Sequence, residues 1–317
     1  MAYKKRLVCL LALIAVLALF YIGSFVFSYD MGNTRSASYA WLDSRDAGRI
    51  TRIAFNTGWE EFELAKRGDQ WFVSHNGSEY PARLLRVEDF LRILTTRSSW
   101  PVRSTSASYS DRFGLNENAA RVTVYSEQTP LLDLLIGDED PMGREAYFRR
   151  AGQNEVRSGD SSINMYISGR VASWYNLRLV SESEGGNVNV GSVQRLSVRN
   201  GEGTQNVQQF SRRNRGWDVT GIVTENLDHN SIENYIRDIL NTEGSNFVDS
   251  VSSFDPVFNH SNITLEFGNG RVVNIRLTDG DEEGHRLANV SGREYIYSIP
   301  VWIASRLFRD AASFEMQ

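Results

Sequence analysis

The feature that most constrains the fold is an internal repeat in the order of predicted strands and helices. Each half of the chain opens with a similar segment, Ile50-Thr51-Arg52-Ile53 in the first and Val193-Gln194-Arg195-Leu196 in the second. A later strand carries Trp71 in the first half and Trp217 in the second. An order of elements that recurs in one chain is typical of duplicated modules, so we expect two tandem copies of one module.

A helix with one apolar face follows in each half. The first helix is expected over Ala82–Thr95, and the second is expected to begin at a capping box of Asn230 and Glu233 and to end near Gly244. Apolar residues three and four positions apart predict helices that cover one face of a sheet. These residues are Leu84, Val87, Phe90, Leu91 and Leu94 in the first half, and Ile232, Tyr235, Ile236, Ile239 and Leu240 in the second.

Each half continues with a predicted β-hairpin and then an acidic turn that contains glycine. The hairpin turn is Gly268-Asn269-Gly270 in the second half and is expected near Thr129-Pro130 in the first. The acidic turns are Gly137-Asp138-Glu139-Asp140 and the segment from Asp279 to Gly284. The predicted fold class is therefore α+β, with antiparallel strands dominating and helices on one face of each sheet.

A long uncharged run precedes the repeated part. Lys4, Lys5 and Arg6 are followed by Leu7–Phe27, a run of 21 residues without a charge. About 20 apolar residues in a helix span the hydrocarbon core of a bilayer. A cleaved signal peptide, which is the alternative, would have a shorter apolar stretch and a small-residue cleavage site. We therefore expect a transmembrane helix that remains uncleaved, with the N-terminus in the cytoplasm.

These patterns divide the chain into four parts. Residues 1–29 hold the basic flank and the anchor, residues 30–180 the first α+β module, residues 181–190 a linker with Gly185-Gly186, and residues 191–317 the second module. The predicted location is the cytoplasmic (inner) membrane, crossed once through residues 7–27, with both modules on the extracytoplasmic, periplasmic side.

Charge and cysteine content exclude several classes of protein. The net charge is −5, and without the three N-terminal cations 31 basic residues face 39 acidic ones, which gives −8. An acidic body argues against nucleic acid as a partner. The single cysteine, Cys9, lies in the apolar run, so the modules have neither disulfides nor a cysteine-rich metal site.

The sequence has none of the common catalytic signatures. It contains no Gly-x-Ser-x-Gly elbow, no Walker loop and no Gly-x-Gly-x-x-Gly after a strand. The four histidines lack the spacing of a zinc site and are interpreted as solvated loop residues: His75, His229, His260 and His285. We therefore assign no catalytic residue and expect no cofactor.

The acidic turn of the second half offers the only metal candidates, Asp279, Asp281 and Glu283. Its oxygen-rich spacing resembles the start of a calcium loop, with Gly284 in sixth place. The twelfth position is Val290, where such a loop needs a bidentate glutamate. A solvated hairpin turn is therefore the preferred interpretation, and we expect no metal.

Tryptophans raise the question of stacking against carbohydrate, and five were considered: Trp59, Trp71, Trp100, Trp217 and Trp302. Trp71 and Trp217 occupy matching strand positions. Matching positions in two copies fit duplicated core residues better than a sugar platform, so we expect these two to be buried.

Several segments, taken in order, carry a resemblance to a known family: Phe62-Glu63-Leu64, Gln70-Trp71-Phe72-Val73, the helix Ala82–Thr95, Phe113-Gly114-Leu115, Leu135-Ile136-Gly137-Asp138 and Ala146-Tyr147-Phe148-Arg149. In this order they are similar to the bacterial domain-of-unknown-function 4340 family over about residues 50–180, and the second half echoes them less strongly. The resemblance implies a single-anchor envelope protein that accompanies transport systems of the ATP-binding-cassette (ABC) type, including ones similar to gliding-motility transporters. It implies no active-site residues.

Three hypotheses for function follow. The leading one is a non-enzymatic, membrane-anchored extracytoplasmic protein that serves as an accessory or scaffold subunit, with the permease and ATPase of an ABC-type system, or another envelope protein, as partner. The second is an extracytoplasmic ligand-binding module with a site between the two copies. The third is an envelope hydrolase that uses carboxylates such as Asp279 and Asp281, which would have to lie about 5–9 Å apart.

Overall fold

The computed structural model of the chain describes residues 38–181, 188–201, 207–214, 216–222, 226–248, 258, 261–279 and 284–316. The predicted anchor over residues 7–27 and the linker glycines Gly185-Gly186 lie outside these ranges. The chain divides into two compact units. The first contains Met1–Ala65 and Arg86–Arg170, and the second contains Lys66–Leu85 and Val171–Gln317.

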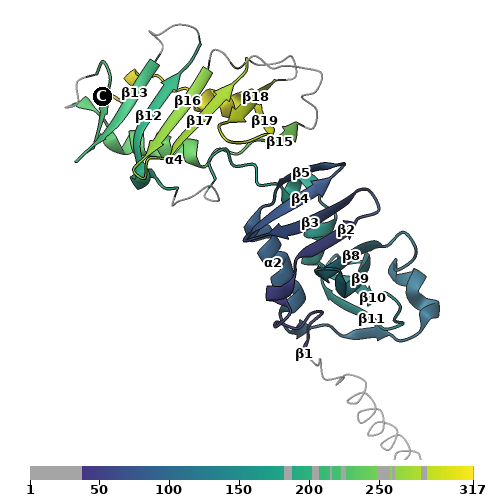
Figure 1. Cartoon of the computed structure of the whole chain (residues 1–317). Coiled ribbons are helices and arrows are strands. Elements are labelled where there is room, and N and C mark those ends of the chain that lie inside the picture. Colours follow the sequence, from purple (N-terminus) through teal and green to yellow (C-terminus); the bar gives the residue numbers. More distant parts are fainter. Residues whose placement is uncertain are drawn as a thin grey trace, which may run out of the picture. The chain divides into compact units, whose positions relative to one another are not determined.

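Nine of the described strands form one antiparallel sheet, here called the first sheet (Figure 1). They are β2 (Arg52–Asn56), β3 (Glu61–Arg67), β4 (Gln70–His75), β5 (Ser78–Pro81), β7 (Val102–Ser104), β8 (Ala120–Ser126), β9 (Thr129–Glu139), β10 (Glu145–Arg150) and β11 (Val156–Asp160). Their order across the sheet is β5-β4-β3-β2-β8-β9-β10-β11-β7. Apolar residues alternate along the central strands, and those on the core side are buried, as Val122 and Val124 are in β8.

Eight of the described strands form the second sheet. They are β12 (Val193–Arg199), β13 (Val207–Arg213), β14 (Gly216–Val219), β15 (Asn246–Val248), β16 (Ser261–Phe267), β17 (Val272–Leu277), β18 (His285–Val290) and β19 (Ile296–Pro300). Their order is β14-β13-β12-β16-β17-β18-β19-β15. Apart from the extra edge strand β5, each position in the first sheet has a counterpart at the same place in the second. The prediction of a sheet-rich structure that also contains helices is confirmed.

One amphipathic helix packs against each sheet, α2 (Leu84–Thr95) on the first and α4 (His229–Leu240) on the second (Figure 1). The ring of Phe90 in α2 lies 5.4 Å from that of Phe55 in β2. The ring of Tyr235 in α4 lies 5.9 Å from that of Phe210 in β13. Helix α4 buries all five residues of its predicted stripe, but α2 buries only Val87, Phe90 and Leu94. Leu84 was expected on the buried face and is 46% exposed, because it stands in the first turn beyond the edge of the packed stripe.

The predicted capping box of α4 is wrong. The helix begins two residues earlier, where the carboxylate of the N-cap residue Asp228 accepts hydrogen bonds from the backbone N–H groups of Asn230 and Ser231. An aspartate at this position satisfies donors that the first helical turn leaves unpaired, so Asn230 lies within the helix. The helix ends at Leu240, several residues before Gly244.

The paired tryptophans are buried, as predicted. Trp71 in β4 is 7% exposed and Trp217 in β14 is 1% exposed. The second hairpin turn also lies at its predicted place, between β16 and β17. The first hairpin turn lies just before Thr129, because Thr129 already belongs to β9 and the turn contains Glu127 with a positive φ of 54°.

Shorter elements complete the described chain. Strands β1 (Ser38–Tyr39) and β6 (Ser98–Ser99) form a separate two-stranded sheet. Two further short helices are α3 (Asn164–Ile167) and α5 (Val301–Arg306). The 3-10 helices are η1 (Ala47–Arg49), η2 (Ala107–Phe113), η3 (Ser161–Ile163), η4 (Val171–Trp174), η6 (Val190–Ser192) and η9 (Ala311–Phe314).

Candidate functional site

Only one of the three acidic residues considered as metal candidates lies in the part of the chain that the structure describes. Asp279 is exposed two residues after the end of β17, and Asp281 and Glu283 lie outside the described residues. Across the described ranges, no three His, Cys, Asp or Glu side chains gather closely enough to hold a metal ion. Val290, the twelfth position of the would-be calcium loop, is 1% exposed in β18 and contributes to the core.

The first acidic turn is displaced from its predicted position. Gly137, Asp138 and Glu139 continue strand β9, and the turn begins at Asp140. The carboxylate of Asp140 accepts backbone hydrogen bonds from Arg144 at 2.6 Å and from Glu145 at 3.0 Å, and these bonds lower its pKa. Asp140 therefore holds the turn together.

The histidines also differ from the prediction that they are loop residues. Of the three that the structure describes, His75 ends β4, His229 begins α4 and His285 begins β18. The Nδ1 atom of His229 accepts a hydrogen bond from the backbone N–H of Trp217 at 3.2 Å, which links α4 to β14. His260 lies outside the described residues.

Two of the segments that carried the family resemblance meet in space. A Cβ atom added at Gly137 would overlap the carbonyl oxygen of Phe113, and one added at Gly114 would overlap the side chain of Asp138. Gly114 also has a left-handed φ of +66°, which disfavours any other residue. The pairing of Phe113-Gly114 with Gly137-Asp138 thus fixes the end of η2 against β9.

An open hollow of 850 Å³ lies in the first unit, between the β2–β3 turn and the segment that joins η2 to β8. Two carboxylates and two guanidinium groups line it, together with amides and hydroxyls. The charged and polar residues of the lining are Asn56, Thr57, Ser110, Asp111, Asn116, Glu117, Asn118, Arg121 and Arg149. The balance of charge makes the hollow polar but close to neutral.

Trp59 stands at the rim of this hollow and is 91% exposed. The turn that presents it is closed by its own hydrogen bonds. Asn56 Oδ1 accepts from the backbone N–H of Gly58 at 3.0 Å, and Thr57 Oγ1 accepts from that of Glu60 at 3.1 Å. The Asn56 amide also donates to Glu61 Oε1 at 2.6 Å. A large indole is therefore held in solvent by a well-bonded turn.

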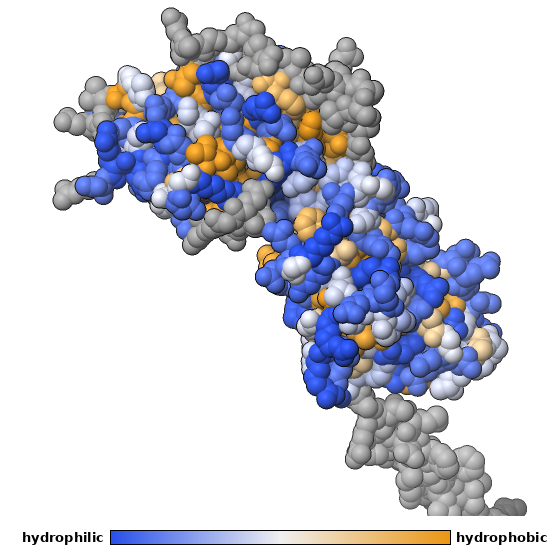
Figure 2. All heavy atoms as spheres, viewed as in Figure 1, coloured by the Kyte–Doolittle hydropathy of each residue, from blue (hydrophilic) through white to orange (hydrophobic). Residues whose placement is uncertain are grey.

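Sequence reasoning grouped Trp59 with the other tryptophans and gave it no separate role. A signal was present, because Trp59 follows Asn56-Thr57-Gly58, and asparagine with glycine at this spacing is typical of a turn. Trp71 and Trp217 instead alternate with polar residues in strands, which predicts burial. On the face drawn in Figure 2, hydrophobic residues are scattered among a hydrophilic majority.

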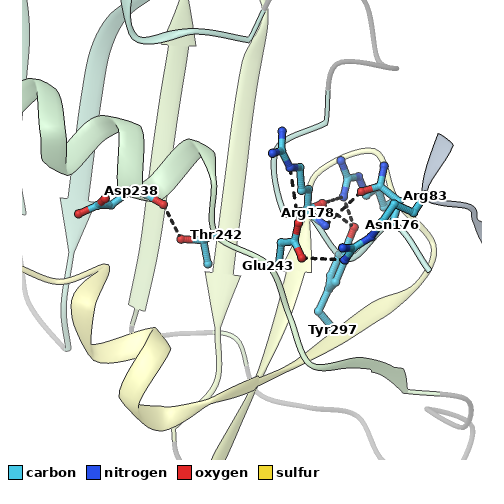
Figure 3. Close-up of polar contacts among 8 residues, drawn as sticks. Arg83, Asn176, Arg178, Asp238, Thr242, Glu243 and Tyr297 are labelled. Carbon is cyan, nitrogen blue, oxygen red and sulfur yellow. Dashed lines mark hydrogen bonds and ion pairs between the residues drawn. The ribbon is translucent and has the colours of Figure 1, made fainter. Parts of the chain in front are cut away.

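A second polar cluster lies within the second unit and centres on Glu243 (Figure 3). Its carboxylate accepts a hydrogen bond from Arg83 Nη2 at 2.8 Å and pairs with Arg178 Nε at 3.6 Å. The carbonyl oxygen of Arg178 accepts from Arg293 Nη1 at 3.0 Å and from the buried Tyr297 hydroxyl at 3.3 Å. Burial raises the pKa of Tyr297, which keeps the phenol protonated as a donor.

Apolar packing in the same unit accompanies this cluster. The rings of Tyr80 and Phe247 are stacked at 4.3 Å, and Tyr175 and Tyr297 lie 5.2 Å and 5.0 Å from Phe247. The three side chains that form the ion pairs are 38–46% exposed, and exposed pairs contribute little to stability. The cluster therefore orients the segment around Arg178, while the buried rings supply most of the stabilisation.

No helix within the described ranges has the length and apolar character needed to cross a bilayer.

Comparison with protein-family models gives one match, to "Domain of unknown function (DUF4340)", over residues 46–257. Neither the curated proteins nor the solved structures gave a match to this chain. The family match covers the first sheet, helix α4 and the first strands of the second sheet. It also contains both glycine-bearing segments that meet at η2 and β9. This chain is therefore a member of the DUF4340 family.

Proposed function

We propose that the protein is a single-pass, membrane-anchored extracytoplasmic protein that acts as a non-enzymatic accessory or scaffold subunit, with an ABC-type transport system as its partner. The observation that carries the proposal is the shared strand order of the two sheets. Tandem copies of one sheet-plus-helix module give a chain two related surfaces, and repeated modules are commonly used to bind macromolecules. The transporter as partner comes from the expectation attached to the family.

The anchor is part of this proposal and has its own test. Leu7–Phe27 would span the bilayer, with Lys4, Lys5 and Arg6 retained in the cytoplasm. An arginine at the centre of a spanning helix costs about 2.5–3.5 kcal/mol on insertion scales. A variant carrying Leu13→Arg and Leu17→Arg should leave the membrane fraction on alkaline extraction, and the matched Leu13→Ala, Leu17→Ala variant should stay.

The partner is tested by co-purification of the full-length chain from membranes solubilised in a mild detergent. We expect a permease and an ATPase of one ABC-type system to be recovered with it. The matched control is residues 1–29 fused to an unrelated soluble domain, which keeps the anchor and removes both modules. Recovery of the full-length chain alone, or with the same proteins as the control fusion, would contradict the proposal.

A further inference from the structure

We propose that the hollow beside Trp59 is a binding site for a neutral oligosaccharide, with the indole as the platform for a sugar ring. This site goes beyond the accessory role, because a glycan-binding surface does not require a transporter. Three properties of the described residues carry the inference: the presentation of Trp59, the chemistry of the hollow, and polar groups in its walls that lack partners.

The first property is the exposure of Trp59. Its side chain is 91% exposed, whereas most large apolar side chains of the first unit are buried. A tryptophan offers a flat apolar face, and burying it against a ligand releases water from more area than for any other side chain. The closed hydrogen bonding of its turn lowers the entropic cost of holding the ring in place.

The second property is the chemistry of the hollow. A volume of 850 Å³ is within the range of small-ligand sites, and amides, hydroxyls and both signs of charge line it. Amide groups can both donate hydrogen bonds to hydroxyl groups and accept them, and carboxylates can accept them. Groups of both signs line the hollow, and Arg121 is already paired with Asp133, so no cluster of one charge marks the lining as a site for an ion. At the centre of a protein–protein interface, by contrast, a tryptophan such as Trp59 would be surrounded by apolar residues that exclude water.

The guanidinium groups of the hollow are fixed in place. Arg121 Nε donates to Asp133 Oδ1 at 2.8 Å, and Arg149 Nη2 donates to the carbonyl oxygen of Leu115 at 3.1 Å. Groups held by such contacts lose little freedom when a ligand binds. Arg121 and Arg149 therefore line the hollow in fixed positions before a ligand binds.

The third property is a pair of polar groups in the walls without partners. Ser110 is 8% exposed, and its Oγ atom has no hydrogen-bond partner among the described residues. The Nε atom of Arg149 is also buried without a partner in that part of the chain. Buried polar atoms are nearly always bonded to protein or to water. Ser110 and Arg149 both line the hollow, so a ligand with hydroxyl groups could supply the partners that these two atoms lack.

The test uses the full-length chain purified in a zwitterionic detergent, because detergents with sugar headgroups would compete. Tryptophan fluorescence and calorimetry would be recorded with N-acetylchitotetraose, cellotetraose and maltotetraose. We expect saturable binding of at least one of the three, and Trp59→Ala should weaken it about tenfold, since an aromatic contact contributes about 0.5–1.5 kcal/mol beyond area burial.

The matched control is Trp302→Ala, because Trp302 is 60% exposed and belongs to the second unit. It should leave the affinity unchanged, and thermal unfolding should show that both variants fold. The proposal would be overturned by absence of saturable binding to all three tetrasaccharides, by equal loss in the two variants, or by full affinity in Trp59→Ala. A photocrosslinker at position 59 that captures a protein while no sugar binds would also overturn it. Because this experiment contains no transporter, its failure leaves the accessory role to be tested separately.

Discussion

The two sheets have one strand order but differ in the side chains at equivalent places. Register makes the positions comparable: Ala120 pairs with Ile136 across β8 and β9, as Ser261 pairs with Leu277 across β16 and β17. The next residue along the second strand is Gly137 in the first sheet and Thr278 in the second. The topology therefore tolerates different residues, and the contacts above each sheet decide which residue fits.

The helices show the same contrast. Val87, Phe90 and Leu94 of α2 have the spacing of Ile232, Tyr235 and Ile239 of α4, and all six are buried. Phe90 is wholly apolar, but the hydroxyl of Tyr235 donates to the carbonyl oxygen of Leu307 at 2.6 Å. The residue that follows α5 thus supplies a polar partner in the second half, at a place where the first half packs Phe90 against the rings of Phe55 in β2 and Tyr166 in α3.

The largest expected effects come from the paired tryptophans. Trp217→Ala should lower the free energy of unfolding by about 3–5 kcal/mol, because a fully buried indole is replaced by a cavity. Trp71→Ala should cost somewhat less, since Trp71 is 7% exposed against 1% for Trp217. Urea unfolding followed by circular dichroism would measure both, with the exposed Trp302→Ala as the control expected within about 0.5 kcal/mol of wild type. If Trp71→Ala left the free energy of unfolding unchanged, Trp71 and Trp217 would not be equivalent core residues.

The next prediction concerns Gly137, whose counterpart in the second half is Thr278. Gly137→Ala should destabilise the protein by about 1–3 kcal/mol, because the new methyl group would overlap the carbonyl oxygen of Phe113. The counterpart Thr278→Ala should cost about 0.5–1.5 kcal/mol, through loss of the hydrogen bond that Thr278 Oγ1 accepts from Leu287 N–H at 2.9 Å. Chemical denaturation of both variants would decide. If Gly137→Ala has wild-type stability, then η2 can shift away from the new methyl group without lowering the free energy of unfolding.

The third prediction concerns Phe90 in α2 and Tyr235 in α4, each replaced by the residue that the other helix has at the equivalent position. Tyr235→Phe should cost about 0.5–1.5 kcal/mol, because the carbonyl oxygen of Leu307 loses its donor. Phe90→Tyr should cost about 1–3 kcal/mol, because it adds a hydroxyl at a site that is 0% exposed. Burial raises the pKa of Tyr235, so the difference between Tyr235→Phe and wild type should not change between pH 6 and pH 9. Stabilisation by Phe90→Tyr would show that the first sheet does hold a partner for the hydroxyl.

The smallest effect is electrostatic and belongs to the start of β10. Glu145 pairs with Asp160 across β10 and β11, where the second sheet pairs His285 with Pro300. Hydrogen bonds from the hydroxyl of Ser158 and the guanidinium of Arg103 lower the pKa of Glu145 below its ordinary value of 4.5. The pKa of Glu145 is lower in the folded than in the unfolded protein. The stability that its hydrogen bonds contribute is therefore present above pH 4.5 and is lost as the pH falls through the folded pKa.

Arg103→Gln should therefore raise the pKa of Glu145 towards 4.5, as carbon-13 NMR of the carboxyl group would show. The change in stability at pH 7 should stay below about 1 kcal/mol, because the pair is partly exposed. Arg121→Gln is the matched control, since Arg121 pairs with Asp133 and not with Glu145. An unchanged pKa of Glu145 in Arg103→Gln would contradict the assigned cause.

Much of the fold could be predicted, because its signals are local and periodic. Alternation identified the strands around Val122 and Ile263, and the stripe from Ile232 to Leu240 identified α4. The capping box failed because two polar side chains near the helix start compete, and Asp228 is the one placed to accept from the free N–H groups. The turn predicted at Gly137-Asp138 failed because glycine there serves a contact with η2, which no local pattern reveals.

The candidate site was less predictable, since it is assembled from distant segments. The hollow joins Trp59 to Ser110, Asn118 and Arg149, which come from separate elements of the first unit. Their residue types are common on any surface. Only the combination of one exposed indole with a polar, charge-balanced hollow distinguishes them.

The sequence by itself determined the α+β class, the repeated order of elements and the burial of Trp71 and Trp217, because periodicity of apolar residues reflects which faces must leave water. Tertiary structure alone decided that Gly137 must lack a side chain, that Tyr235 can keep a hydroxyl in the core, and that Trp59 stands exposed over a polar hollow. These outcomes depend on atoms brought close by folding from far along the chain, and such proximity leaves no periodic trace in the sequence.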